Sequence, residues 1–404
     1  MKKELLIEKR EKTKELHDSG WSIRKISRYL VSSKKSIIKW AALNDKELSK
    51  DCRGWKKGMP RKYTYKAKEE IKKIRSELEE QDSYFFGAKV VKSNYEKRTG
   101  TKVSKDFVDR TLREAKMVKS PQKKRRGLSR YMKYPQRTLS KLGKRMMSID
   151  FIGPKYLKGS ARGVNFLSCK YIRPERFGIL RRVGGQTTEQ TVKTLKEIWE
   201  DNPIPDVIKL DNDSAFGTNL LHDKSLGKLT LFFLNFGVTP VYIAPRTPWS
   251  NGENEGFNSV FSKKLWNRMR FKNEEEVDVK IKEFNVAYEQ YTKLVSNNPK
   301  TKSVIINNFD DIDFENRHVK KFKSHVIHFL RIVRRKNEKG SDKEYGFINV
   351  LNEEIKIPKE LINLFVFCTL DLKSKKLIIN SELDNGKLHK IKSIKFEIAN
   401  IKYG

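Results

Sequence analysis

The chain has 404 residues, with 88 Lys and Arg against 50 Asp and Glu, so its formal net charge is +38. Such a basic balance favours nucleic acid as the partner, because Lys and Arg neutralise phosphates and release counterions. The three cysteines are far apart, which excludes a disulfide framework and a Cys-based zinc finger. The apolar runs are too short to cross a bilayer and no signal peptide is evident, so we expect a cytoplasmic protein with no membrane partner.

The first predicted domain covers residues 1–58 and has a helix-turn-helix layout. A charged helical pattern over residues 3–18 ends at a glycine. Ser22 can cap a short helix over residues 23–30, and a Ser-rich turn leads to a third helix at residues 34–40. Three basic residues on the exposed side of that helix are predicted to bind DNA: Lys34, Lys35 and Lys39. The alternative is an ordinary three-helix unit.

A second helix-turn-helix domain is predicted over residues 62–118. Residues 65–81 have a strong helical pattern, and a second helix starts near Phe86 and ends before Gly100. Ser104 is the expected N-cap of a third helix that continues to Lys116. The predicted DNA contacts of this domain are Lys105, Arg110 and Arg113.

Residues 119–145 contain many Lys and Arg residues and no acidic residue. Like charges repel, so we expect a linker that does not fold on its own. A solvated linker and one that follows the DNA backbone are compatible interpretations. The predicted DNA contacts here are Lys123, Lys124, Arg125 and Arg126.

An α/β pattern occupies residues 146–300. The strand candidates are residues 146–152, 164–171, 177–183, 206–211 and 238–243. The helix candidates are residues 188–200, 225–236, 251–271 and 275–294. Three strands, a helix, a strand, a helix, a strand and further helices is the element order of a ribonuclease-H-like fold.

Residues 318–404 contain short runs rich in β-branched and aromatic residues, separated by turn signals. These runs are residues 326–334, 345–350, 354–357, 364–372, 377–379 and 391–398. They predict a small all-β barrel of SH3-like type. The expected fold class is therefore multidomain, with all-α helix-turn-helix units, an α/β core and a C-terminal barrel.

Three acidic residues stand at suggestive places in the α/β pattern. Asp150 and Asp211 each end an apolar run, and Glu255 lies in the first turn of a helix. Carboxylate oxygens are the ligands that Mg²⁺ prefers, and two ions can clamp the attacking and leaving oxygens of a phosphoryl transfer. Glu253 is a rival third ligand, but two positions away on a helix it points elsewhere. Around them, Arg246, Trp249, Lys263 and Lys264 are candidate DNA contacts.

These motifs resemble the Asp-Asp-Glu core of the retroviral-integrase-like transposase superfamily. The resemblance rests on Asp150, on Leu210-Asp211-Asn212 and on Ser250-Asn251-Gly252-x-x-Glu255, at intervals of 61 and 44 positions. Residues 62–118 likewise resemble bacterial insertion-sequence transposases. The shared pattern is a glycine, an apolar helix, a second glycine, Val103-Ser104 and then a helix that holds Arg110, Leu112 and Arg113.

The resemblance implies that Asp150, Asp211 and Glu255 are catalytic residues and metal ligands. It also implies two Mg²⁺ ions, with Mn²⁺ as a substitute. The substrate would be double-stranded DNA, both element ends and target, and the protein would act as a homo-oligomer on DNA in the bacterial nucleoid. Its reaction would be 3′-end cleavage followed by strand transfer.

Two departures from the family pattern bear on whether the protein is catalytically active. Asp213 stands where a glycine usually follows the Asn, and the late Asn/Arg pair is not evident in residues 288–291. The alternatives are an inactive, transposase-derived DNA-binding regulator and a structure-specific ribonuclease-H-like nuclease. The intact triad argues against the first, and the paired helix-turn-helix patterns argue against the second.

Overall fold

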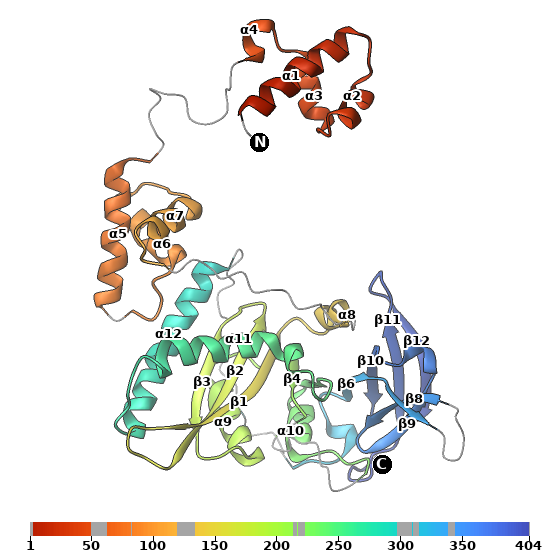
Figure 1. The fold of residues 1–404 in the computed structure, drawn as a ribbon. Helices are drawn as coiled ribbons and strands as arrows, with labels where there is room; N and C mark the ends of the chain where they lie inside the picture. Colours follow the sequence, from red (N-terminus) through yellow and green to blue (C-terminus); the bar gives the residue numbers. More distant parts are fainter. Residues whose placement is uncertain are drawn as a thin grey trace. The chain divides into compact units, whose positions relative to one another are not determined.

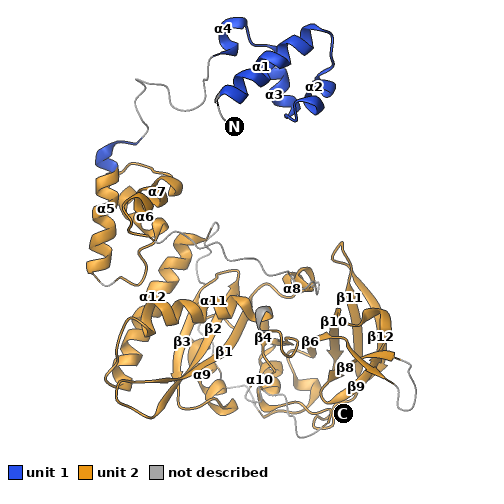
Figure 2. Cartoon of the chain, in the orientation of Figure 1, with its two compact units in different colours: residues 1–67 blue, residues 68–404 orange. Residues whose placement is uncertain are grey.

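The computed structural model describes residues 3–49, 63–81, 83–118, 134–212, 216, 223–296, 309, 315–337 and 344–403. The chain divides into two compact units, residues 1–67 and 68–404, which Figure 2 colours separately. Asp213 and four predicted DNA contacts lie outside the described residues: Lys123, Lys124, Arg125 and Arg126. No helix of the described ranges is long and apolar enough to cross a membrane.

The first unit is a small helical bundle. Its helices are α1 (Lys3–Asp18), α2 (Ile23–Tyr29), α3 (Lys34–Ala41) and α4 (Asp45–Leu48). The hydroxyls of Ser22 and Ser33 cap α2 and α3 by accepting from the backbone N–H groups of Lys25 and Ser36. Apolar residues of α1 to α3 form one core: Leu6, Leu16, Ile26, Ile37 and Trp40. The three predicted helices are present, while their role in DNA binding stays a prediction.

The second helical group opens the larger unit and packs on its core. It consists of α5 (Tyr65–Glu80), α6 (Ala88–Thr99) and α7 (Lys105–Glu114), and Ser104 caps α7 as predicted. Phe85 stacks on Tyr291 of α12 (Glu274–Val295), with ring centroids 4.3 Å apart. Lys89 also donates to the carbonyl of Val295 at 2.8 Å. These contacts attach the group to the α/β part of the chain.

A nine-stranded mixed sheet is the centre of the larger unit (Figure 1). The core strands are β1 (Met146–Tyr156), β2 (Gly163–Arg173), β3 (Gly178–Val183), β4 (Val207–Leu210) and β5 (Thr239–Tyr242). The first three are antiparallel, and β4 and β5 run parallel to β1 in the spatial order β5-β4-β1-β2-β3. The helices between them are α9 (Thr188–Glu200) and α10 (Lys228–Phe236). This element order is the predicted one.

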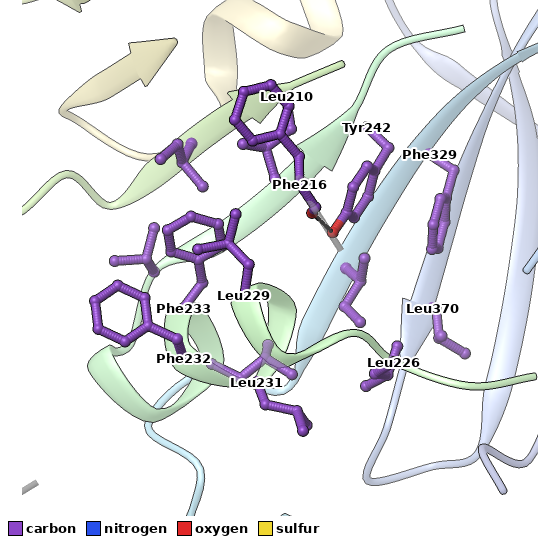
Figure 3. Close-up of a cluster of buried hydrophobic side chains, with 14 of the residues drawn as sticks. Leu210, Phe216, Leu226, Leu229, Leu231, Phe232, Phe233, Tyr242, Phe329 and Leu370 are labelled. Atoms are coloured by element: carbon purple, nitrogen blue, oxygen red, sulfur yellow. Dashed lines mark hydrogen bonds between the residues drawn. The ribbon is translucent and has the colours of Figure 1, made fainter. Parts of the chain in front are cut away.

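The two faces of the core sheet differ because side chains alternate along a strand. One face is apolar and packs against α9 and α10 in a large cluster, part of which Figure 3 shows. In that view Phe216 lies beside Leu210 of β4, Phe232 and Phe233 project from α10, and Tyr242 donates to the carbonyl of Phe216 at 3.2 Å. The other face carries α11 (Gly252–Phe261) and α12.

The helix predicted over residues 251–271 is shorter and has three parts. A 3₁₀ turn, η2 (Pro248–Asn251), leads into α11, and a single π-type turn, η3 (Ser262–Trp266), ends it. Buried Leu265 and Phe271 and partly buried Trp266 pack in the same cluster as α12, so the chain turns back to cover them. Helical periodicity alone does not reveal such a turn.

The C-terminal strands form two sheets. Four of them, β6 (Val326–Ile332), β10 (Phe365–Asp371), β11 (Lys376–Glu382) and β12 (Leu388–Lys395), extend the core sheet. The others, β7 (Arg334–Asn337), β8 (Glu344–Val350) and β9 (Glu353–Ile357), form a separate three-stranded sheet. Short 3₁₀ turns complete the segment, η4 (Val319–Lys321) and η5 (Lys359–Leu361).

The predicted independent barrel is not confirmed, because β6 pairs in parallel with β5 of the core. Val241 lies opposite His328, and Tyr242 lies opposite Phe329. Consecutive residues of β6 are buried, so both of its faces are covered, as in the interior of a large sheet. The C-terminal strands and the core therefore share one sheet.

Part of the expected basic linker is also structured. Residues 136–141 form a short helix, α8 (Gln136–Lys141). The carboxylate of Glu382 on β11 accepts from the backbone N–H of Thr138 at 2.6 Å and from its hydroxyl at 2.5 Å. Arg137 donates to the carbonyl of Asp384 at 2.7 Å. Long-range partners thus stabilise a segment whose own composition disfavours folding.

Candidate active site

Strand pairing places Asp150 and Asp211 on neighbouring strands. In the parallel register of β1 and β4, Met146 lies opposite Val207, and Ser148 lies opposite Lys209. That register has an offset of 61 positions, the same as the offset between Asp150 and Asp211. Asp150 therefore lies at the level of Asp211, which immediately follows the last residue of β4. Asp150 lies on the face of the sheet that α11 covers, where Asn258 of that helix contacts it.

Helix α11 is held on that face by three asparagines at helical spacing. Asn251 Oδ1 accepts from the Ser148 hydroxyl at 2.5 Å. The Ser168 hydroxyl lies 2.6 Å from Asn254 Oδ1 and 2.7 Å from Asn258 Oδ1. Residues three and four apart share a helix side, so these side chains face β1 and β2 together. The sequence analysis missed them, although their helical spacing is visible in the sequence.

Asn258 also contacts the first predicted acid directly. Its Nδ2 donates to Asp150 Oδ2 at 2.9 Å, which fixes one oxygen of this partly buried carboxylate. Asp150 itself pairs in register with Ser168 of β2. The strand and the helix thus orient the carboxylate through a continuous polar network.

The two glutamates of α11 have different surroundings. Glu253 Oε2 accepts from Nζ of Lys209 at 3.2 Å, and the Lys209 side chain is only 4% exposed. Glu255 is exposed and forms no ion pair within the described part of the chain. It is close enough to Asp150 to contribute to its electrostatics. The arrangement favours Glu255 over Glu253 as the third acid.

The pKa of Asp150 is raised to about 6. Burial is the largest cause, followed by the negative charge of Asp211, and Glu255 adds a smaller repulsion. The Asn258 hydrogen bond opposes the shift, because it stabilises the ionised form. The three predicted acids are therefore electrostatic neighbours.

Asn212, which follows Asp211, is held by the backbone just after β5. The Asn212 N–H donates to Asp211 Oδ1 at 2.5 Å, and the Asn212 side chain donates to the carbonyl of Ile243. Arg331 of β6 donates to the same carbonyl at 3.3 Å. A single carbonyl thus links Asn212 of the site to the C-terminal part of the sheet.

The donor chemistry fits a hard divalent cation, since all three acids supply oxygen, and burial together with repulsion from Asp211 and Glu255 raises the pKa of Asp150. In the described ranges, however, no group of three His, Cys, Asp or Glu side chains converges closely enough to hold one ion. The three acids are neighbours, but their carboxylates do not converge on one metal position.

Two buried lysines were also missed. Lys209 lies within the apolar run of β4, and burial lowers its pKa. Lys170 of β2 donates to the carbonyl of Arg176 at 3.0 Å and to the Tyr288 hydroxyl at 3.1 Å, and burial lowers its pKa to about 7. Side chains alternate along a strand, so both lysines point to the face that α11 covers while their apolar neighbours point to the other face. This alternation in the sequence could have identified them.

The predicted DNA contacts of the helical units lie at the surface. Lys34, Lys35 and Lys39 are exposed on α3, in the first unit. Lys105, Arg110 and Arg113 are exposed on α7, in the second unit, and Arg113 pairs with Asp109. The predictions of DNA binding are not tested by these positions.

Comparison with known proteins gives a family match. Residues 236–291 match the family model of an integrase core domain, and this range contains Glu255 but neither Asp150 nor Asp211. This segment of the chain is similar to an integrase core domain. The predicted resemblance to integrases is confirmed for these residues. None of the curated proteins matches the chain.

Solved structures give weaker likenesses. The catalytic core of BIV integrase is 14% identical, with 39% of this chain and 86% of that chain covered and a TM-score of 0.26. The simian T-cell lymphotropic virus intasome is 12% identical, with coverage of 67% and 93% and a TM-score of 0.33. The Mos1 mariner paired end complex with Mn is 15% identical, with coverage of 73% and 98% and a TM-score of 0.24. At such TM-scores these likenesses carry no further argument.

Proposed function

We propose that this integrase-like chain is a transposase that cuts the 3′ ends of its own mobile element and joins them to target DNA. The observation that carries the proposal is the placement of Asp150 level with Asp211 on neighbouring strands, with the helix of Glu255 held over Asp150 by the Asn258 hydrogen bond. The integrase core match over residues that contain Glu255 supports the reaction class. The net charge of +38 supports DNA as substrate.

Asp150, Asp211 and Glu255 would hold one or two Mg²⁺ ions, for which Mn²⁺ would substitute. Bound divalent ions supply Lewis-acid activation of a water or 3′-hydroxyl nucleophile and stabilise the leaving oxygen. Asn258 orients the Asp150 carboxylate, and Lys209 retains Glu253 in an ion pair. Cation binding would lower the pKa of Asp150 from about 6, because it neutralises the repulsion among the acids.

Binding of element ends is assigned to the two helical units. The exposed residues of α3 and α7 are the proposed contacts: Lys34, Lys35, Lys39, Lys105, Arg110 and Arg113. The basic residues Lys123, Lys124, Arg125 and Arg126 are proposed to contact the DNA backbone. Since two ends must be joined in one reaction, the proposed active form is a homo-oligomer on DNA.

The test is cleavage of a labelled element end with Mg²⁺, with Mn²⁺ and with EDTA. We expect nicking at the 3′ end in either metal, none in EDTA, and none with Asp150→Ala, while the variant still binds the end. Cleavage by the variant would contradict the assigned site. Binding without cleavage by the unmodified protein in both metals would instead indicate a transposase-derived regulator.

A further inference from the structure

A basic pocket of about 460 Å³ lies between the β5–α11 loop and the C-terminal strands. Its polar and aromatic lining residues are Arg246, Arg331, Arg334, Phe347 and Asn349, and none of the described lining residues is acidic. No carboxylate of the described residues forms an ion pair with any of these three arginines. The volume falls in the range of about 300–1,000 Å³ typical of small-ligand sites.

Arg331 lines the pocket and is buried, with only 7% of the residue exposed, and backbone carbonyls hold its side chain in place. Its Nε donates to the carbonyl of Asn349 at 2.7 Å, and its Nη1 donates to the carbonyls of Leu330 and Ile243 at 2.8 and 3.3 Å. Burial and the nearby charge of Arg334 lower its pKa to about 10, so it stays charged at neutral pH. A buried cation without a carboxylate partner is costly unless an anion neutralises it.

The rim of the pocket carries two further guanidinium groups and an aromatic ring. Arg246 is exposed and adopts a φ of +61°, a left-handed conformation that non-glycine residues rarely hold without a local reason. Arg334 is exposed on β7 directly opposite Phe347 of β8, whose ring is partly buried. Guanidinium groups bind phosphate, and aromatic rings stack on unpaired bases.

The pocket adjoins the proposed active site. Arg331 and Asn212 share the carbonyl of Ile243, and Asn212 follows Asp211. Arg246 lies in the loop that leads from β5 to the helix of Glu255. The pocket and the proposed active site are thus joined through the carbonyl of Ile243 and through the loop that precedes α11.

We infer that this pocket binds one unpaired nucleotide of the DNA strand at the active site, with its phosphate on the arginines and its base against Phe347. The choice of DNA rests on the proposed function. A paired base is stacked within its duplex and is not free to leave the stack and lie against Phe347, so the site would distinguish an unpaired end from a blunt duplex. Pro245, Ile332 and Ile348 supply apolar lining for the base.

The test compares the affinity of the full chain for a short duplex with an unpaired tail and for the same duplex with a blunt end, in EDTA. We expect Arg334→Gln and Phe347→Leu each to weaken binding of the tailed DNA on the order of tenfold, with little effect on blunt DNA. Arg246→Gln should act in the same direction. Arg331 is left intact, because its bonds to three carbonyls support the fold.

Arg335→Gln is the matched control. Arg335 is the neighbouring residue on β7, is exposed, and pairs with Glu344 at 3.1 Å instead of lining the pocket. It should leave the preference for the tailed DNA unchanged. Equal losses on both DNAs, no preference in the unmodified protein, or unchanged preference in Phe347→Leu would each overturn the inference.

The assay contains no metal, so its outcome is separate from catalysis. An unmodified protein that cleaves element ends but shows no preference for the tailed DNA would refute the pocket alone. A retained preference without metal-dependent cleavage would refute the proposed reaction alone.

Discussion

At the scale of single residues, Asp150 is expected to destabilise the metal-free protein. Its folded pKa of about 6 lies above the ordinary value of 3.8, so the folded state favours the protonated carboxyl. The resulting stabilisation is complete below the unfolded pKa and is lost as pH rises through about 6. Asp150→Asn keeps an acceptor for Asn258 and removes the charge.

We predict that Asp150→Asn raises the free energy of unfolding by about 1–3 kcal/mol at pH 8 in EDTA, after a discount for partial exposure. The gain should disappear towards pH 4. Denaturant titration measures both values. Asp201→Asn, at the exposed C-cap of α9, is the control and should change little. A less stable Asp150→Asn protein at pH 8 would disprove the electrostatic account of the site.

Glu253 provides a second test at this scale, because it partners a buried lysine. Burial lowers the pKa of Lys209, and the charge of Glu253 opposes that shift. Removing the carboxylate leaves Lys209 with less compensation, so Glu253→Gln should lower the free energy of unfolding by about 1 kcal/mol at neutral pH. Denaturant unfolding measures this change. Glu255→Gln is the control, because among the described residues Glu255 forms no ion pair that the substitution would remove. Equal stability of Glu253→Gln and the unmodified protein would argue against a structural ion pair.

At the scale of elements, the junction of β5 and β6 carries a titratable group. His328 is 8% exposed, lies opposite Val241, and has its Nδ1 3.1 Å from the Thr369 hydroxyl. Burial lowers its pKa from 6.5 to about 4. The unfolded state therefore binds the proton more tightly, and stability that is present above pH 6.5 is lost as pH falls towards 4.

We predict that His328→Gln shows a smaller loss of stability between pH 6.5 and pH 4 than the unmodified protein. The difference should reach up to about 3 kcal/mol at pH 4. Denaturant titration at a series of pH values checks it, and the comparison between the two proteins cancels carboxylates that titrate in the same range. Parallel pH profiles would mean that β6 does not bury the imidazole.

The elements that could be predicted are those whose signals are local. The apolar runs that end at Asp150 and Asp211 indicated β1 and β4, and Ser22 and Ser104 marked helix starts that the structure has. The pairing of β6 with β5 could not be predicted, because these strands lie more than eighty positions apart and each has an ordinary strand pattern. Helix α8 likewise depends on Glu382, far along the chain.

The candidate site was predicted in part. The residue types and spacing indicated Asp150, Asp211 and Glu255, and the structure brings their charges close enough to interact. The supporting asparagines were missed because a polar residue on a helix face is usually solvated, and their hydroxyl partners belong to distant strands. The sequence likewise gives no sign that Lys209 pairs with Glu253, since that contact depends on where α11 crosses the sheet.

At the scale of the whole molecule, the net charge of +38 predicts strongly salt-dependent DNA binding. Each phosphate contact contributes about 0.9 to the slope of log K against log salt. Replacing Lys34, Lys35 and Lys39 together by Gln should therefore reduce the slope by about three for element ends. Affinity measured across a salt series gives the slope.

A triple variant of equal charge change controls for that effect. Lys373, Lys376 and Lys387 are exposed in the C-terminal part, and their replacement by Gln also removes three positive charges. If α3 contacts the DNA, the first variant should lower the slope more than the second. Equal slopes would assign binding to net charge instead of to the first helical unit.

The most direct test of the central claim is strand transfer of a pre-cut element end into plasmid DNA with Mg²⁺, compared between Glu255→Gln and Glu253→Gln. Both variants remove one carboxylate from the same helix, so only position differs. The account predicts that Glu255→Gln abolishes transfer and that Glu253→Gln retains it. Transfer by Glu255→Gln, or its loss only in Glu253→Gln, would contradict the assignment of Asp150, Asp211 and Glu255 as the catalytic acids.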